Sequence, residues 1–144
     1  MPRIALDTNG YVEILRGGAA AEAIRAGMVS ARGGLHVLMP VITELLQGAR
    51  TPAEARSIRR RFLDPVPDVR RVAATPAQWA GTGDLVAEML RAGHDRAELA
   101  RRMFWLDVHV ATLCRASGIT LLTDDRDHLR IEPYVHHLLR PLPT

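Results

Sequence analysis

The chain contains no lysine, because all 19 of its basic residues are arginine. This absence excludes three kinds of α/β protein that need a lysine at the site: Walker A nucleotide-binding proteins, Schiff-base enzymes and phospho-acceptor receiver domains. The arginines leave a formal net charge of +3. A basic surface suits a polyanion such as nucleic acid, although an ordinary solvated exterior explains the charge equally well.

Cysteines, aromatic residues and long apolar runs are also scarce. The single cysteine, Cys114, cannot form an internal disulfide or a thiolate zinc site, so we interpret it as a core residue. Two Trp, two Tyr and two Phe leave little material for a base-stacking platform. No apolar run approaches the ~20 residues of a membrane span, and only three apolar residues separate Arg3 from Asp7. We therefore expect a cytoplasmic protein without a signal peptide.

A chain of 144 residues with 47% apolar residues is long enough for one compact domain, which we place at residues 1–144. The apolar pattern predicts strands at about 3–7, 35–39, 69–72 and 119–123, and a last strand-like run at about 135–139. It predicts helices at about 8–16, 19–27, 40–48, 52–63, 76–93 and 95–117, with a candidate break near Arg102. Strands that alternate with helices predict an α/β sandwich around a parallel sheet.

Acidic residues stand at the edge of the predicted core. Asp7 and the pair Asp124-Asp125 each follow a predicted strand, where ligands bind in open parallel sheets. Glu44 and Asp107 lie inside otherwise apolar helical stretches. Carboxylates ~4 Å apart repel by roughly 4 kcal/mol per pair at an effective dielectric near 20, so such a cluster needs compensation. Mg²⁺ or Mn²⁺ would supply it, and the chemistry of such a site is hydrolysis of a phosphodiester.

Each acid also has an alternative explanation. Asp7 could be a helix N-cap, and the acids after the 119–123 strand could be turn residues. Glu44 could lie at a partly exposed helix edge. Asp107 is harder to explain in this way, because it shares a helical stripe with apolar residues at i+3, i+4 and i+7.

Four segments together resemble the motifs of PIN-domain ribonucleases, in particular the VapC-type toxins of toxin–antitoxin pairs. The segments are residues 4–9 (IALDTN), 41–49 (VITELLQGA), 106–112 (LDVHVAT) and 119–127 (ITLLTDDRD). The resemblance covers nearly the whole chain. It implies a three-layer sandwich with a central, mostly parallel five-stranded sheet flanked by helices.

The resemblance also implies a site. It assigns metal binding and catalysis to four acids: Asp7, Glu44, Asp107 and Asp125. It places five further residues around them: Thr8, Asn9, Thr123, Asp124 and Asp127. The implied activity is Mg²⁺-dependent or Mn²⁺-dependent RNA cleavage by a homodimer that a VapB-like antitoxin neutralises. Which residues bind the nucleic acid is unknown.

The chain departs from the family pattern at a few positions. Gly10 stands where an aliphatic residue is usual, the pair His109-Val110 replaces a more usual small or aliphatic pairing, and His128 stands where an aromatic residue is common. Two alternative functions stay open: a catalytically inactive PIN-like module that binds RNA or protein, and a metal-dependent DNase. An aspartyl-nucleophile phosphatase fits less well, because it expects an aspartate where this chain has Asn9, together with a lysine. The adjacent pair His136-His137 is predicted to occupy exposed strand positions.

Overall fold

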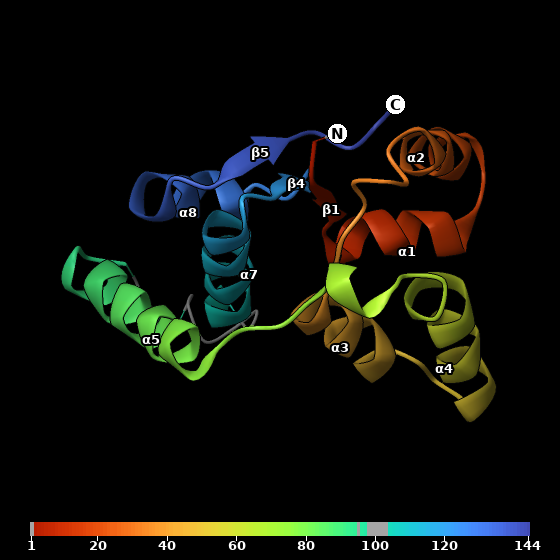
Figure 1. Ribbon diagram of the computed structural model, residues 1–144. Coiled ribbons are helices and arrows are strands. Elements are labelled where there is room, and N and C mark those ends of the chain that lie inside the picture. Colours follow the sequence, from red (N-terminus) through yellow and green to blue (C-terminus); the bar gives the residue numbers. More distant parts are fainter. Residues whose placement is uncertain (1, 95, 98–103) are drawn as a thin grey trace.

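The computed structural model describes residues 2–94, 96–97 and 104–144 (Figure 1). Its centre is a set of short strands that all pair in parallel. Strand β1 (Ile4–Leu6) pairs with β4 (Thr120–Leu122), which also pairs with β5 (Leu138–Arg140). Strand β2 (Val37–Leu38) pairs with β3 (Arg71–Val72). Because the strands are parallel, the chain must return over the sheet between them, and helices make these returns.

The predicted parallel sheet is confirmed, but its hydrogen bonding is less continuous than expected. The three-stranded ladder β1-β4-β5 and the two-stranded ladder β2-β3 are separate. A single bridge between Ile4 and Leu35 links them, with backbone bonds from Ile4 N to Gly34 O and from His36 N to Ile4 O. The ladder stays short because helix α3 begins at Met39, directly after β2.

The first half of the chain is mainly helical, and capping residues mark where several helices begin. The helices are α1 (Thr8–Arg16), α2 (Ala19–Ser30), α3 (Met39–Gln47) and α4 (Pro52–Ile58), which continues as the π-helical turn η1 (Arg59–Leu63). A 3₁₀ turn, η2 (Asp68–Arg70), precedes β3. Thr51 caps α4 by accepting a hydrogen bond from Glu54 N. Gly17 ends α1 with φ of 79°, a conformation that glycine adopts without a Cβ clash.

The second half contributes α5 (Pro76–Arg91), α7 (Phe104–Ser117) and α8 (Asp127–Val135). Thr75 and Gln78 form a reciprocal capping box at the start of α5. The helix predicted over 95–117 is present as α7. Most of its predicted first part, including the break expected near Arg102, lies outside the described residues.

The prediction for the region after β4 was wrong in two respects. Residues 127–135 form α8, which the sequence analysis did not predict, and Val135 ends this helix instead of starting a strand. His136 then adopts a left-handed conformation with φ of 56°, and β5 begins only at Leu138. The sequence analysis assigned no helix or strand to residues 128–134, but Ile131 and Val135, one helical turn apart, are both buried.

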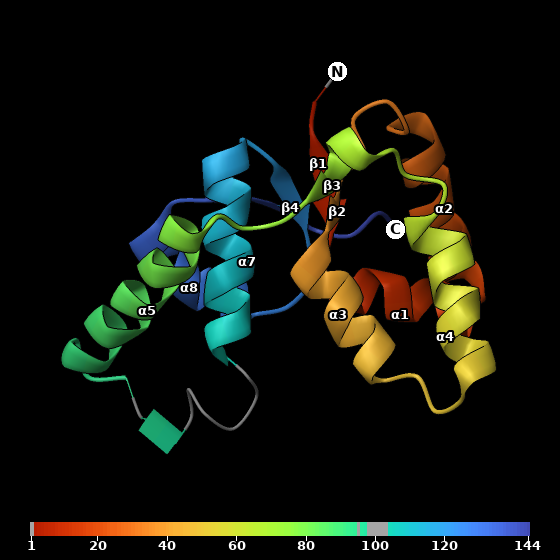
Figure 2. The same cartoon turned by 60° about the horizontal axis from the view of Figure 1, so that its bottom comes forward.

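Two clusters of buried side chains hold the helices in place. The larger cluster packs the strands against α1 to α4 and includes Val110, Leu113 and Cys114 of α7. The smaller cluster joins α5, α7 and α8 through six buried residues: Met89, Phe104, Val108, Ala111, Ile131 and Val135. Figures 1 and 2 show α7 lying between α5 and the strands. Helix α7 therefore contacts both clusters, which fixes the position of its Asp107.

None of the helices in the described part of the chain combines the length and the apolar character that a membrane span requires.

Candidate metal centre

Asp7 follows β1 directly and is only 4% exposed. Its Oδ1 accepts a hydrogen bond from Thr8 N at 2.8 Å, and its Oδ2 accepts one from Thr123 Oγ1 at 2.8 Å. Burial raises the pKa of Asp7, and the charge of Asp125 raises it further. The hydrogen bonds from Thr123 and Thr8 lower it, but each by less than burial raises it. Asp7 is the N-cap of α1, so the alternative explanation given for it in the sequence analysis is confirmed. Its second oxygen, Oδ2, lies 3.7 Å from His128 Nε2, and ligand atoms of Asp7, Asp107 and His128 lie within 4.8 Å of one another.

Glu44 lies on α3 and is half-buried. Its Oε2 accepts a hydrogen bond from Thr8 Oγ1 at 2.5 Å. Thr8 therefore connects the carboxylate of α3 to the start of α1, where Asp7 lies. The charge of Glu44 also contributes to the raised pKa of Asp107.

Asp107 projects from the first turn of α7, and its side chain is 19% exposed. Its pKa is raised to about 8, first by burial and then by the charges of four acids: Asp7, Asp125, Glu44 and Asp127. A carboxyl group in such surroundings binds a proton at neutral pH unless a cation replaces it. Asp107 is therefore the group whose charge is least compensated by the protein itself.

Asp125 and Asp127 reach Asp107 from the turn after β4. Carboxylate oxygens of these three residues lie within 4.8 Å of one another. Hydrogen bonds fix the turn: Asp125 N donates to Thr123 Oγ1 at 3.0 Å, and Asp127 N donates to Asp125 Oδ1 at 2.9 Å. Thr123 thus holds Asp7 with its hydroxyl hydrogen and Asp125 through its oxygen, which joins the ends of β1 and β4.

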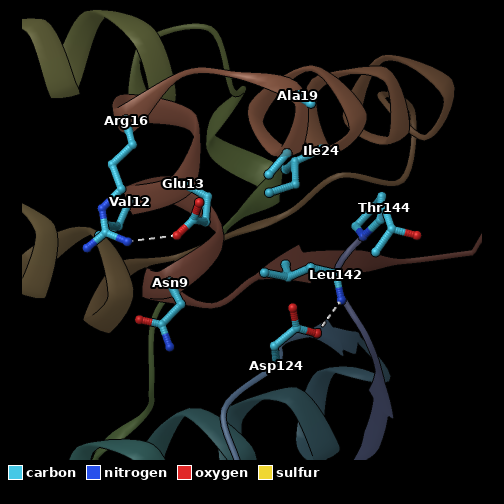
Figure 3. Close-up of a pocket in the computed structure, with 11 residues that line it drawn as sticks. Asn9, Val12, Glu13, Arg16, Ala19, Ile24, Asp124, Leu142 and Thr144 are labelled. Atoms are coloured by element: carbon cyan, nitrogen blue, oxygen red, sulfur yellow. Dashed lines mark hydrogen bonds and ion pairs between the residues drawn. The ribbon is translucent and has the colours of Figure 1, made fainter.

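Asp124 and Asn9 lie outside this cluster. Asp124 is exposed, and its Oδ1 accepts a hydrogen bond from Leu142 N at 3.0 Å. Figure 3 shows both residues at a separate cavity of about 640 Å³ between α1, α2 and the segment after β5. Asp124 therefore holds the C-terminal segment in place, and Asn9 faces the cavity.

The sequence analysis gave no role to a buried pair of histidines beside the acids. His128 of α8 is fully buried, and its Nε2 lies 3.7 Å from Asp7 Oδ2 and 4.0 Å from Asp107 Oδ1. Its Nδ1 lies 3.2 Å from Nε2 of His137, which is 3% exposed instead of lying on an exposed strand as predicted. Burial lowers the pKa of both rings to about 4, so both are neutral at pH 7.

The donor set fits a divalent cation. Carboxylate oxygens are the ligands that Mg²⁺ and Mn²⁺ prefer, and the structure offers them from β1, α7 and the turn after β4. A second combination of Asp7, Asp107 and His128 also brings its ligand atoms within 4.8 Å of one another. The buried Nε2 of His128 has no hydrogen-bond partner in the described structure, as expected of an atom that a ligand would contact.

Comparison with known proteins identifies the family. A family model of the PIN domain matches residues 4–132. A search of curated proteins finds no match.

Solved structures share the fold at low sequence identity. They include VapBC2 from Rickettsia felis bound to a DNA fragment from their promoter (TM-score 0.66, 18% identity, 96% of this chain and 97% of that chain covered). FitAcB from Neisseria gonorrhoeae has a TM-score of 0.68 with 16% identity over 94% and 95% of the two chains. DNA-bound VapBC from Salmonella typhimurium has a TM-score of 0.63 with 17% identity over 99% of each. The family model covers most of the sequence and the solved structures match its fold, so the chain belongs to the PIN domain family.

Proposed function

We propose that this protein is a metal-dependent endoribonuclease of the VapC type, a single domain spanning residues 1–144. The observation that carries the proposal is the convergence of Asp107, Asp125 and Asp127, whose carboxylate oxygens lie within 4.8 Å of one another beside the buried Asp7. Like charges at this spacing repel strongly in a partly buried site. A divalent cation is the simplest compensation, and PIN-family membership favours a nuclease as the protein that uses it.

In this proposal Asp7, Glu44, Asp107 and Asp125 hold Mg²⁺ or Mn²⁺ and carry the catalysis. When bound, the ion supplies a Lewis acid for a phosphodiester oxygen and lowers the pKa of water. Thr8 fixes Glu44, and Thr123 fixes Asp7 and Asp125, through the hydrogen bonds described above. Asp127 extends the acidic surface next to Asp107 and Asp125. Asn9 and Asp124 shape the neighbouring cavity and do not contact the ion.

Cleavage of a mixed cellular RNA pool tests the proposal. The purified protein is assayed with Mg²⁺, with Mn²⁺ and with EDTA, alongside Asp7→Asn. The matched control is Asp84→Asn, which changes an exposed aspartate of α5. We expect discrete metal-dependent fragments from the wild type and from Asp84→Asn, and none from Asp7→Asn. Full activity of Asp7→Asn, or cleavage that EDTA does not affect, would overturn the proposal.

The same assay separates the two alternatives. Single-stranded and double-stranded DNA of matched sequence are included as substrates. Preferential cleavage of DNA would establish a metal-dependent DNase instead. A folded protein that binds no metal and cuts no substrate would establish an inactive binding module.

The acids of the turn after β4 can be ranked in the same experiment. Asp125→Asn should lose cleavage, because its carboxylate belongs to the cluster with Asp107. Asp124→Asn should keep it, because the asparagine oxygen can still accept the hydrogen bond from Leu142 N. The reverse order would show that the cavity beside α1, and not the acid cluster, contains the reacting centre.

We also propose that the protein forms a homodimer in the cytoplasm and is neutralised by a VapB-like antitoxin. The support is the likeness in fold to VapBC complexes from two bacteria. An arginine of the antitoxin inserted among the acids is a plausible inhibitory contact, since guanidinium pairs well with carboxylates. The test is co-expression with the product of a small reading frame directly upstream. Co-purification with loss of cleavage supports the pairing, and independent purification of two active proteins contradicts it.

A further inference from the structure

The Nε2 atom of His128 is a buried polar atom without a hydrogen-bond partner in the described structure. It points at the acid cluster, since its two closest charged neighbours are Asp7 Oδ2 at 3.7 Å and Asp107 Oδ1 at 4.0 Å. Both separations exceed the 2.7 to 3.2 Å range of N–H···O hydrogen bonds. The imidazole is therefore close to both carboxylates but bonded to neither.

These separations suit ligands of a shared ion. Two ligand atoms bound to one cation at about 2.1 Å lie about 3.0 Å apart when adjacent and up to about 4.2 Å apart when opposite. Both distances from His128 Nε2 fall within this range. One ligand atom each of Asp7, Asp107 and His128 lies within 4.8 Å of the other two.

The other side of the ring is held by His137. His128 Nδ1 and His137 Nε2 lie 3.2 Å apart, and the two ring planes are inclined at 62°. An imidazole that binds metal through Nε2 must carry its proton on Nδ1 and donate it to an acceptor. With the proton of His128 on Nδ1, His137 Nε2 accepts this hydrogen bond and leaves His128 Nε2 free to bind a metal. In that arrangement His137 is a positioning residue for His128.

We propose that His128 is a direct nitrogen ligand of the cation bound by Asp7 and Asp107, and that it makes the site prefer Mn²⁺ over Mg²⁺. The inference rests on the proposed function, because it concerns the same acid cluster. Imidazole is a softer donor than carboxylate and binds transition ions in preference to Mg²⁺, which takes oxygen ligands almost exclusively.

Pulsed electron paramagnetic resonance of bound Mn²⁺ tests the ligand directly, because coordinated imidazole nitrogen modulates the electron spin echo. The wild-type protein should show these nitrogen modulations, and His128→Phe should lose them. The matched control is His109→Phe, which removes an equally buried imidazole whose Nε2 also has no partner in the described structure. His128→Gln gives the same test if the phenylalanine variant fails to fold, as circular dichroism would show.

Isothermal titration with Mn²⁺ and with Mg²⁺ provides the second readout. His128→Phe should weaken Mn²⁺ binding by about 10-fold to 100-fold and Mg²⁺ binding by less than about 3-fold. His109→Phe should alter neither, whereas Asp7→Asn should weaken both.

The outcomes separate the two proposals. Mn²⁺ binding without nitrogen modulations in the wild type, or modulations that survive in His128→Phe and His128→Gln, would overturn the ligand role of His128 and leave the acidic metal centre intact. A wild-type protein that binds neither ion would overturn the metal centre itself.

Discussion

Two buried histidine environments lie on either side of α7, and they differ in their neighbours more than in their burial. His109 and His128 are each fully buried, and the Nε2 of each has no partner in the part of the chain that the structure describes. His109 pairs through Nδ1 with Thr82 Oγ1 at 2.7 Å and stacks on Trp79 with ring centroids 3.8 Å apart. His128 faces Asp7 and Asp107 instead.

The comparison shows that burial does not decide the role of a histidine. Burial lowers the pKa of both rings, so both are neutral at pH 7. The hydroxyl and the indole beside His109 offer a structural contact between α5 and α7, and burial lowers the pKa of His109 with no charged group of the described residues contributing. The carboxylates beside His128 convert the same neutral ring into a candidate metal ligand.

Removal of the Asp107 carboxylate should make the surroundings of His128 most like those of His109, and it should have the largest effect of the changes considered. Asp107→Asn keeps the size of the side chain but removes its charge, which leaves His128 beside fewer anionic ligands. We expect Mn²⁺ affinity to fall by more than about 100-fold and RNA cleavage to fall below detection, because the ion loses a central ligand. Titration calorimetry and the RNA assay measure these effects, with Asp84→Asn as the control. Unchanged Mn²⁺ affinity would exclude Asp107 from the metal centre.

The pH dependence of stability should distinguish the acids from the histidines beside them. The pKa of Asp107 is about 8 in the folded protein against 3.8 for an ordinary aspartate, so the folded state holds an extra proton between these values. The free energy of unfolding of EDTA-treated protein should therefore fall as pH rises, and the raised pKa of Asp7 acts in the same direction. His109, His128 and His137 act in the opposite direction, because their lowered pKa values favour folding as the pH rises through the ordinary histidine range near 6.5.

A comparison of the wild type with Asp107→Asn between pH 6.5 and 8 isolates the contribution of Asp107, because the histidine contributions are common to both proteins. Across this window we expect the free energy of unfolding of the wild type to fall by about 1.5 kcal/mol relative to that of Asp107→Asn. Urea titrations of both proteins at several pH values measure this difference. The same pH dependence in the two proteins would contradict the proton uptake by Asp107.

The sequence located the acids of the site and most of the helices that hold them, but it did not locate the histidines. Periodicity and capping residues located α1, α3, α4 and α5, and the positions of Asp7, Glu44, Asp107 and Asp125 at strand ends and on helices made them candidates for one site. The structure brings these acids to one end of the strands, as described above. Their roles as ligands stay predictions.

The histidines could not be placed from the sequence for a physical reason. His137 was expected on an exposed strand because α8 was not recognised, and without α8 nothing turns His128 toward the acids. Burial of Ile131 against Met89 and Phe104 of distant elements fixes that helix, and such contacts are not visible in a local pattern. Likewise, the role of Asp124 depends on Leu142, 18 residues away.

The structural interpretation of His109 can be sharpened by removal of its hydrogen-bond partner. Thr82→Val keeps the shape of the side chain but leaves Nδ1 of His109 buried without its 2.7 Å contact. We expect a loss of about 1 kcal/mol in the free energy of unfolding, the usual cost of one buried neutral hydrogen bond. Mn²⁺ affinity should not change. A variant that lost Mn²⁺ binding while remaining folded would show that the two histidine environments are coupled.

The stacking contact of Trp79 should have the smallest effect. Trp79 is 48% exposed, and its ring lies nearly parallel to that of His109, at 15°. Trp79→Leu removes the aromatic face but keeps apolar cover over α7, so we expect a loss of about 0.5 kcal/mol in the free energy of unfolding. Urea titration measures this loss, and the wild-type Mn²⁺ affinity should be retained. A large drop in RNA cleavage with normal Mn²⁺ binding would instead place Trp79 on the path of the RNA, since the groove that it lines also contains Glu44. The environment of His109 would then belong to substrate binding, and the contrast with His128 would be one between two parts of a single active site.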